Sequence, residues 1–575
     1  MNEFAEHIVC CNGVKPCGDD NGVQYLALEY KDGCPNKNVS INLNRFVTAV
    51  YHIDDRLKDL LEIAGYIFSA DRKTYRGNNN DLFYHSWSRA FHFYIGVRDK
   101  EFWERQDVKN ILEEVLVFLT GDHSYKFTFY EGGDSFPSNI FDNENFTIDT
   151  PGKLKVSLFS GGLDSLAGAI ELLETTDSEL CLVSHQSGQP GVKQTHRLVF
   201  EALNLLYPNR CKHYKYHCGF DHLPSTDETQ RTRSFLYTAT AFTIAKTYNQ
   251  NCIYVYENGI TSINFAETQD LMNARASRTT HPRTLSLLEK LFSMIGETTF
   301  EVKNPFLFKT KTEVVEVLKK YDKLSLLDSS VSCSATRKHC SKFTHCGICS
   351  QCIDRRFAVY AAEIENADEN GIYAFNFMTD DLEEDEIKKS LIEYIGLAQR
   401  FAETNINSFY LDWGSEIIEV EEYIDGGDEE ERVGKLFDLC QRHAEQIENA
   451  IDRMRKIYDK PLAKPRAKSI FSLIIGPREY QKEEKEIKEI PSRGLKKLTK
   501  EACENLIRER IITEVLIETK REKNISALVI KELQKKFDVT KRNENSISDY
   551  FRKLELQIKR QKEGNLIVED NYRHR

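Results

Sequence analysis

The stretch Ser160-Gly161-Gly162-Leu163-Asp164-Ser165 decides the fold of this 575-residue chain. It directly follows the apolar run 155–159, which predicts a strand, and it leads into an apolar pattern over 166–173 that predicts a helix. Two adjacent glycines let the backbone approach a phosphate closely, because no Cβ intervenes. The N–H groups of the helix's first turn and the helix dipole favour an anion at the same point. The sequence therefore predicts a phosphate-binding loop between a strand and a helix.

The polar residues of this loop suggest which anion it holds. Ser160 and Ser165 add hydroxyl donors, whereas Asp164 would repel bare phosphate and so indicates a magnesium ion or an ordered N–H partner. A glycine turn capped by serine and aspartate is the alternative, and the complete six-residue pattern between strand and helix disfavours it. The loop lacks the Gly-Lys-Ser/Thr ending of a Walker P-loop, which disfavours ordinary kinase or GTPase chemistry.

Strands and helices alternate on both sides of this loop. Further apolar strands are expected at 180–183 and 252–256, with a helix over 235–248, and this alternation predicts a parallel sheet covered on both faces. We expect four regions: an α+β accessory domain at 1–150, the α/β domain with a zinc site at 151–365, a helical region at 366–480 and a basic helical tail at 481–575.

A cluster of cysteines lies near the end of the α/β region. Cys333 and the run Cys346-Gly347-Ile348-Cys349-Ser350-Gln351-Cys352 supply four thiolates with two overlapping Cys-x-x-Cys steps. Four thiolates close a tetrahedral structural zinc site, and an iron–sulfur cluster is the alternative. Cys340 and His345 are spare ligands that could replace one of the four.

The charge of the chain is unevenly distributed. Residues 482–575 hold 24 Lys/Arg against 18 Asp/Glu, a charge of +6, so the overall −12 leaves −18 for the body. An acidic body disfavours nucleic-acid binding except through the tail. The tail could form a winged helix from 525–537, 547–558 and a short strand at 565–568, although solvated helices of mixed charge are the favoured interpretation. No apolar run reaches membrane-spanning length and the acidic N-terminus predicts no signal peptide, so we expect a cytoplasmic protein without a membrane partner.

Taken together, these motifs resemble a known family. Ser160–Ser165 resembles the PP-loop of the ATP pyrophosphatase superfamily, whose fold is the adenine nucleotide alpha hydrolase-like parallel sheet. Over about 155–360, the pattern of Cys333 to Cys352 with Arg355 and the segment Asn304-Pro305-Phe306…Lys311-Thr312-Glu313-Val314-Val315 resemble the 7-cyano-7-deazaguanine synthase (QueC) family. The resemblance implies adenylation of 7-carboxy-7-deazaguanine with Mg²⁺ and ATP, use of ammonia, and one Zn²⁺ per chain.

The resemblance also implies roles for individual residues. Asp164, Ser165 and Lys311 are the expected catalytic residues, while Ser184 and His185 are expected to flank the adenine. The full expected set for ATP and magnesium is Ser160, Gly161, Gly162, Asp164, Ser165, Ser184 and His185, with Lys311 on a phosphate, and the expected zinc ligands are Cys333, Cys346, Cys349 and Cys352.

The chain departs from the synthases where the base is expected to bind. Arg233 is followed by Ser234 instead of asparagine, and Glu257-Asn258-Gly259-Ile260 and Arg278–Pro282 stand in place of a Gly-Tyr-Pro-Asp-Cys-Arg segment. These segments resemble the QueC-like proteins of bacterial antiphage operons, the QatC group and the QueC-like component of type IV CBASS. The candidate substrate residues are Arg233, Glu257, Asn258, Arg278 and His281, and surface ion pairing is the alternative for Arg278 and His281.

This subgroup implies a particular acceptor. The activated deazapurine would pass to the N-terminal amine of a partner protein from the same operon, and the flanking regions would recognise that partner. We therefore expect removal of residues 1–150 or of the tail to weaken transfer more than ATP binding. A housekeeping synthase that uses ammonia and a PP-loop scaffold that binds nucleotide without turnover are the alternatives.

Overall fold

The computed structural model describes most of the chain up to residue 458 and two short segments of the tail. The described residues are 6–14, 24–29, 36–42, 54–76, 88–132, 153–186, 190–220, 231–265, 278–334, 343–368, 370–381, 385–458, 469, 558–560 and 566–568. The chain divides into two compact units, one of Ala5–Ile474 and one of Met1–Phe4 with Ile475–Arg575.

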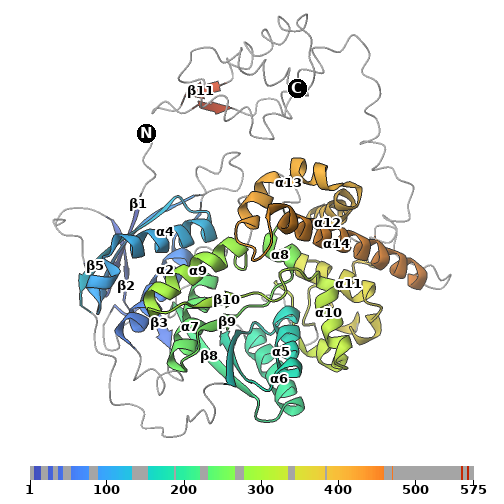
Figure 1. Ribbon diagram of the computed structural model, residues 1–575, viewed down its shortest axis with the longest axis horizontal. Helices are drawn as coiled ribbons and strands as arrows, with labels where there is room; N and C mark the ends of the chain where they lie inside the picture. Colours follow the sequence, from blue (N-terminus) through green and yellow to red (C-terminus); the bar gives the residue numbers. More distant parts are fainter. Residues whose placement is uncertain are drawn as a thin grey trace, which may run out of the picture. The chain divides into compact units, whose positions relative to one another are not determined.

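A six-stranded sheet forms the centre of the larger unit (Figure 1). All its neighbouring strands are parallel except β3, which runs antiparallel to β8. This confirms the predicted parallel α/β sheet, and the strands expected from the sequence overlap β6, β7 and β9. In spatial order the strands are β10 (Glu301–Lys303), β9 (Cys252–Tyr254), β6 (Leu154–Leu158), β7 (Glu179–His185), β8 (Cys211–Phe220) and β3 (Val39–Asn42).

Both faces of this sheet are buried, as the continuous apolar strands predict. Leu180 and Leu182 of β7 pack with the helices α5 (Leu163–Thr175) and α6 (Pro190–Leu206). Cys181 and Val183 pack in a second cluster with the helix α7 (Arg233–Thr247). Because successive side chains of a strand point to opposite faces, one strand contributes to two cores.

The order of the strands reverses next to the phosphate loop. The chain passes from β6 to β7 and β8, and after α7 it returns to β9 on the other side of β6. In open parallel sheets, ligands bind outside the carboxyl ends of the strands at such a reversal. The segments that follow β6 and β9 therefore meet where a ligand is expected.

The N-terminal region carries a sheet of its own. Its strands lie in the order β2 (Tyr25–Leu28), β1 (Glu6–Cys11), β4 (Ala90–Val97) and β5 (Ser124–Glu131), and each neighbouring pair is parallel. The helices of the region are α2 (Asp55–Lys73), α3 (Lys100–Trp103) and α4 (Gln106–Thr120).

The N-terminal region and the central sheet share one hydrophobic core. Phe93 of β4 and Phe68 of α2 belong to the same buried cluster as Phe235 and Phe242 of α7. In addition, β3 leaves the N-terminal region and extends the central sheet, with Ile41 opposite Cys218. The domain boundary near residue 150 stays a prediction, but the packing is continuous across it.

The region after residue 380 is helical, as expected. Its helices are α12 (Asp385–Glu403), α13 (Ile406–Glu421) and α14 (Glu429–Tyr458). Phe401, Phe409 and Trp413 pack with Leu436 in one core, which also holds Ile263 from the helix α8 (Gly259–Ile263). The helical region thus packs directly on the segment that follows β9.

In the smaller unit, the structure describes an antiparallel pair formed by β11 (Ile558–Arg560) and β12 (Leu566–Val568). The second strand coincides with the one expected at 565–568. The two helices of the winged-helix alternative lie outside the described residues, apart from the end of the second at residue 558. Among the described helices, none combines the length and apolar character that a membrane crossing requires.

Candidate nucleotide and zinc sites

The predicted phosphate loop joins β6 to α5 and needs its glycines. Gly161 has φ +76°, in the left-handed region that side chains disfavour, and a Cβ on it would lie 3.1 Å from carbon atoms of both Thr195 and His196. Gly162 is the N-cap of α5 and places no side chain over the first turn. The loop therefore presents its backbone and the positive end of a thirteen-residue helix to a ligand.

The two serines of the loop face each other. Ser160 Oγ lies 3.2 Å from Ser165 Oγ and accepts a hydrogen bond from the N–H of Gly162. Ser165 Oγ also donates to the carbonyl oxygen of Gly162 at 2.9 Å. The hydroxyl groups thus lie around the loop, where they can turn toward a phosphate oxygen.

A segment far along the chain holds the loop in place. The N–H of Val331 donates to the carbonyl oxygen of Gly161 at 3.0 Å, and the N–H of Leu163 donates to Ser332 Oγ at 3.4 Å. Ser332 directly precedes the first cysteine of the zinc cluster. Two hydrogen bonds therefore join the phosphate loop to the segment that leads into the cysteine cluster.

Three carboxyl groups and one lysine meet beside the loop. Lys311, the first residue of the helix α10 (Lys311–Lys320), donates from Nζ to Oδ2 of Asp164. Oδ2 of Asp354, from the helix α11 (Ser350–Ala361), lies 3.8 Å from the same nitrogen. Glu257 follows β9 and lies close enough to Asp164 and Lys311 for their charges to shift its pKa. Four segments that are distant in sequence thus place these side chains together, where the strand order of the sheet reverses.

The cluster holds three acidic groups and one basic group in a buried place. Asp164 and Asp354 are each 8% exposed and Lys311 is 2% exposed. Burial, together with the neighbouring Asp164, raises the pKa of Glu257 to about 8, although Lys311 opposes the shift. Among the described residues, Oδ1 of Asp164 has no hydrogen-bond partner. A buried carboxylate oxygen without a partner, next to a second carboxyl group, fits a divalent cation.

The residues expected to flank adenine lie at the end of β7 and are occupied by contacts within the protein. Ser184 Oγ donates to the carbonyl oxygen of Phe159 at 2.5 Å, and His213 Nε2 lies 2.8 Å from Ser184 Oγ. His185 Nε2 lies 3.0 Å from the carbonyl oxygen of Cys218, and burial lowers the pKa of His185 to about 3. His185 is therefore neutral, and a contact between these two residues and adenine stays a prediction.

The expected substrate residues divide into two groups. Asn258 adjoins the charged cluster, because its Nδ2 donates to Glu257 Oε1 at 3.1 Å, while its Oδ1 caps α8. Arg233 begins α7, and its guanidinium carbon lies 5.8 Å from the ring centre of Tyr237. Tyr237 OH lies in turn 3.2 Å from His185 Nδ1. These residues thus surround the carboxyl ends of the central strands.

Arg278 and His281 are held elsewhere. Arg278 lies over the ring of Phe118 at 4.5 Å and forms a 3.7 Å ion pair with Glu419. His281 is the N-cap of the helix α9 (Pro282–Gly296) and packs edge-on against Phe118. Arg278 thus forms an ion pair, as the alternative expects, whereas the buried His281 caps a helix. Contact of either residue with a substrate stays a prediction.

The sequence reasoning missed two residues of the site, Ser332 and Asp354. Asp354 lies two positions after the last cysteine, among the buried residues of α11. The sequence carries no clear signal for it, because Asp354 stands beside Arg355 and Arg356 in a charged run that a solvent-exposed helix would also show.

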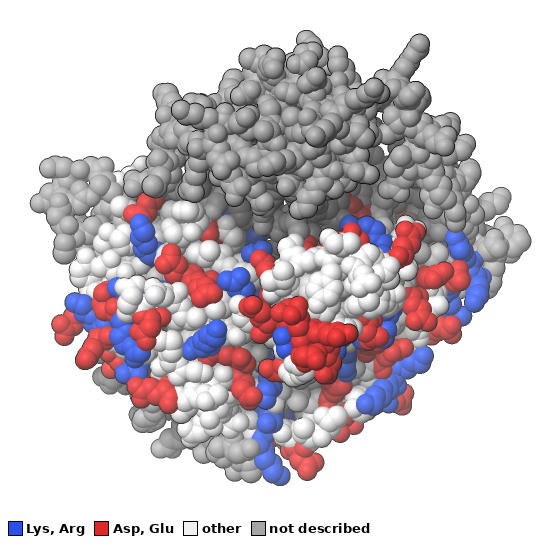
Figure 2. Space-filling model, turned by 45° about the horizontal axis from the view of Figure 1, so that its top comes forward, with Lys and Arg blue, Asp and Glu red and all other residues white. Residues whose placement is uncertain are grey.

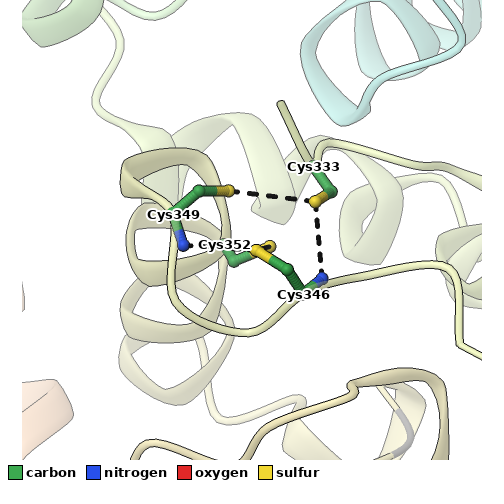
Figure 3. A group of neighbouring side chains, drawn as sticks. All are labelled: Cys333, Cys346, Cys349 and Cys352. Carbon is green, nitrogen blue, oxygen red and sulfur yellow. Dashed lines mark hydrogen bonds between the residues drawn. The ribbon is translucent and has the colours of Figure 1, made fainter. Parts of the chain in front are cut away.

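The four predicted zinc ligands meet in one place (Figure 3). Their sulfur atoms all lie within 4.8 Å of one another, and the Sγ pairs Cys346–Cys352 and Cys333–Cys349 are each 3.9 Å apart. A tetrahedral Zn²⁺ with ~2.3 Å bonds requires sulfur separations of about 3.8 Å. Two of the sulfur separations match this value, and the rest of the set is compact enough for a four-thiolate zinc site.

The spare ligands are not needed for this site. His345 Nε2 accepts a hydrogen bond from the N–H of Ser332, and Thr344 Oγ1 lies 3.0 Å from its Nδ1. Cys340 lies outside the described residues. The four-cysteine set is therefore the one that the structure supports, with His345 beside it.

The fold and the two sites together have the features of a PP-loop α/β protein with a four-cysteine cluster that could hold a metal ion. Residues 237–363 match the family model of the queuosine biosynthesis protein QueC. The match includes Glu257, Lys311, Asp354 and the four cysteines, and it begins after the phosphate loop. No curated protein matches the chain. The match supports a QueC-like PP-loop domain that uses ATP.

Proposed function

We propose that this protein adenylates the carboxylate of a 7-deazapurine such as 7-carboxy-7-deazaguanine and transfers the acyl group to a nitrogen nucleophile. The QueC match of residues 237–363 indicates ATP-dependent chemistry of the 7-deazaguanine type. The observation that carries the proposal is the meeting of the loop Ser160–Ser165 with Glu257 and Lys311 at the reversal of the strand order. This arrangement suits an anionic nucleotide bound together with a divalent cation.

Each residue of the site would have a definite task. The loop backbone, the positive end of α5 and the ammonium of Lys311 would bind the ATP phosphates. Asp164 Oδ1 and Glu257 would hold magnesium, which lowers the charge that the phosphates present to an incoming carboxylate. A carboxylate oxygen of the substrate then attacks the α-phosphorus, and pyrophosphate leaves with the electrons of the broken P–O bond.

The second half of the reaction needs an amine. Its nitrogen attacks the acyl carbon, AMP leaves with the electrons of the acyl C–O bond, and one amine proton passes to solvent. Keeping the adenylate from water favours this transfer over hydrolysis.

Zinc would have a structural task in this protein. Four thiolates fill a tetrahedral ion, so no position remains for water or substrate. Bound to Cys333, Cys346, Cys349 and Cys352, it would fix the segment that contacts the phosphate loop through Val331 and Ser332.

For the acceptor we favour the N-terminal amine of a partner protein from the same antiphage operon. The segments 257–260 and 278–282, which resemble those of the defence-associated proteins, support this choice. The surface of α13 supports a protein partner too. Residues 401–431 hold eleven Asp/Glu and no Lys/Arg, and Leu411 and Ile418 of α13 are 85% and 63% exposed.

Figure 2 shows acidic side chains gathered beside an uncharged area on the face that it presents. A basic segment with apolar side chains complements such a surface. We therefore propose that the partner binds this surface through a segment of that kind.

The test is to follow ATP with 7-carboxy-7-deazaguanine present. We expect AMP and pyrophosphate in equal amounts, and ADP with orthophosphate would contradict the proposal. Intact-mass measurement of the co-expressed neighbouring protein should show the added acyl group on its N-terminus. A second candidate follows from the QueC match itself: full-rate conversion of the free acid and ammonia to the nitrile would identify a housekeeping synthase. A wild-type chain that binds ATP without turnover would instead be a scaffold.

A further inference from the structure

Asp354 is a buried carboxylate to which the proposed reaction has so far given no task. It lies on α11, where Oδ1 accepts a hydrogen bond from the hydroxyl of Tyr394 at 2.8 Å. Within the described part of the chain, its Oδ2 has no hydrogen-bond partner, and this oxygen lies 3.8 Å from Nζ of Lys311. Oδ2 is therefore just beyond bonding distance of the ammonium that is bound to Asp164.

The position of Lys311 conflicts with the proposed binding of magnesium. Its ammonium is hydrogen-bonded to Asp164, the same carboxylate that would hold the cation. A divalent cation and an ammonium on one carboxylate repel each other strongly in a buried site. Lys311 must therefore move away from Asp164 when magnesium and ATP bind.

Leaving Asp164 is costly for a buried ammonium unless another anion takes over. Lys311 is 2% exposed, so the bound phosphates and a neighbouring carboxylate, and not water, must replace the lost partner. Asp354 also lies beside Nζ, with Oδ1 bound to the hydroxyl of Tyr394 and Oδ2 3.8 Å from the lysine nitrogen. A shift of about 1 Å would bring Nζ within ordinary hydrogen-bonding distance of Oδ2.

We propose that Asp354 is a positioning residue that accepts the ammonium of Lys311 when magnesium occupies Asp164, and so keeps the lysine aimed at the ATP phosphates. The inference rests on the proposed function. Asp354 touches neither nucleotide nor metal and acts through Lys311.

The surroundings of Asp354 fix it for this task. It lies two residues after Cys352, on the helix whose N-cap is Cys349, so the zinc site sets the start of α11. Tyr394 comes from α12, which brings the C-terminal helices into the arrangement. The carboxylate is thus held from two sides while Lys311, on a flexible side chain, moves.

The experiment measures nucleotide binding as a function of Mg²⁺ concentration for the full-length chain and for Asp354→Asn. The variant leaves Lys311 bound to Asp164, where it competes with Mg²⁺. We expect the Mg²⁺ concentration at half-maximal ATP binding to rise about tenfold, which corresponds to ~1.4 kcal/mol. Asp354→Glu should restore most of the affinity, and Tyr394→Phe should give a smaller shift in the same direction.

Two further readouts separate positioning from a merely structural role. Zinc content and the unfolding midpoint of Asp354→Asn should stay near those of the wild type, and kcat at saturating Mg²⁺ and ATP should change less than the Mg²⁺ requirement. An unchanged Mg²⁺ midpoint, or a loss of binding that parallels loss of zinc or of fold, would overturn the inference. If Asp354→Asn does not fold, the Tyr394→Phe variant replaces it. An unchanged Mg²⁺ midpoint for ATP binding in that variant would then overturn the inference. A wild-type chain that binds no MgATP would overturn the proposed function as well.

Discussion

The backbone N–H of Val331 donates to the carbonyl oxygen of Gly161 at 3.0 Å, which joins the phosphate loop to the segment that enters the cysteine cluster. Arg355 of α11 strengthens this link, since its guanidinium donates to the carbonyl oxygen of Ser330 at 3.1 Å and is paired with Asp368. The metal site and the nucleotide site are therefore mechanically connected, although they perform different tasks.

Removing zinc should consequently weaken ATP binding as well as the fold. We expect one zinc per chain, and we expect Cys349→Ser to lower the zinc content, the unfolding midpoint and ATP affinity together, because structural zinc contributes to folding directly. Elemental analysis, thermal unfolding and ATP titration measure the three quantities. Cys252→Ser, on β9 and outside the cluster, is the control and should retain all three. Iron in the purified protein would contradict the prediction.

Replacing Asp164 should abolish turnover without unfolding the protein. Asp164→Asn keeps the size of the side chain but weakens its hold on magnesium, and we expect turnover to fall at least about 100-fold, ~2.7 kcal/mol in the barrier. The matched control is Asp177→Asn, an exposed carboxylate just beyond the other end of α5. Release of pyrophosphate is the measurement, and near-wild-type release by Asp164→Asn would exclude the assigned role.

The buried ion pairs of Asp71, which lies near the end of α2, should contribute strongly to stability. Asp71 bonds Arg89 at 2.6 Å, lies 3.3 Å from Arg76 and accepts both the N–H and the hydroxyl of Thr232 just before α7. Asp71→Asn leaves buried guanidinium groups short of a partner and should cost about 3–5 kcal/mol of unfolding free energy. Denaturant unfolding measures this cost. For the exposed pair of Asp107 with Arg105, Asp107→Asn should change the unfolding free energy far less, because solvent screens this pair.

The protein should lose stability as the pH falls below about 6.5, in part through His443. This side chain is 3% exposed on α14, and burial lowers its pKa to about 4. The unfolded chain binds the proton near pH 6.5, whereas the folded chain resists it down to about pH 4. His443 thus contributes stability above pH 6.5 that declines by about 3 kcal/mol between these two values.

The measurement for His443 is denaturant unfolding from pH 7.5 to pH 4.5. His443→Gln should make the unfolding free energy depend less on pH, whether or not it changes the stability at pH 7.5. If His443→Gln leaves the slope of unfolding free energy against pH unaltered, this histidine has the same pKa in the folded and unfolded states, and the prediction is wrong.

Polar substitutions on α13 should weaken acyl transfer to the partner protein without affecting ATP binding. Leu411→Ser combined with Ile418→Ser removes exposed apolar area, so we expect transfer to the partner protein to fall about tenfold while ATP binding stays constant. Leu205→Ser, which alters an 81% exposed leucine at the end of α6, is the control. Equal transfer by all variants would place the partner on another surface.

Because the N-terminal region and the central sheet share one hydrophobic core, truncating the N-terminal region cannot test partner binding by itself. Removal of 1–150 would take away β3 and α2, and would expose Phe235 and Phe242 to water. We therefore expect this truncation to unfold the larger unit, instead of weakening transfer selectively as the sequence suggested. Point substitutions such as those on α13 are the better test of partner binding.

The sequence alone determined the features that are encoded in short, contiguous stretches. The loop from Ser160 to Ser165 and the four cysteines were recognisable because a phosphate loop and a Cys-x-x-Cys site use neighbouring residues whose spacing fixes the geometry. The strand–helix alternation likewise predicted the parallel sheet and its covered faces. In each case, the physical signal lies in the spacing of residues along the chain and does not require knowledge of which distant segments pack together.

Tertiary structure alone decided which distant side chains meet. Asp164, Glu257, Lys311 and Asp354 span nearly two hundred positions, and only the reversal of strand order between β6 and β9 brings them together. The pairing of β3 with β8 and the use of Arg278 and His281 to hold helices also depend on packing across the chain. The periodicity of apolar residues shows which face of a helix or strand is buried. The topology of the whole chain decides which other element packs against that face, and short-range periodicity carries no information about it.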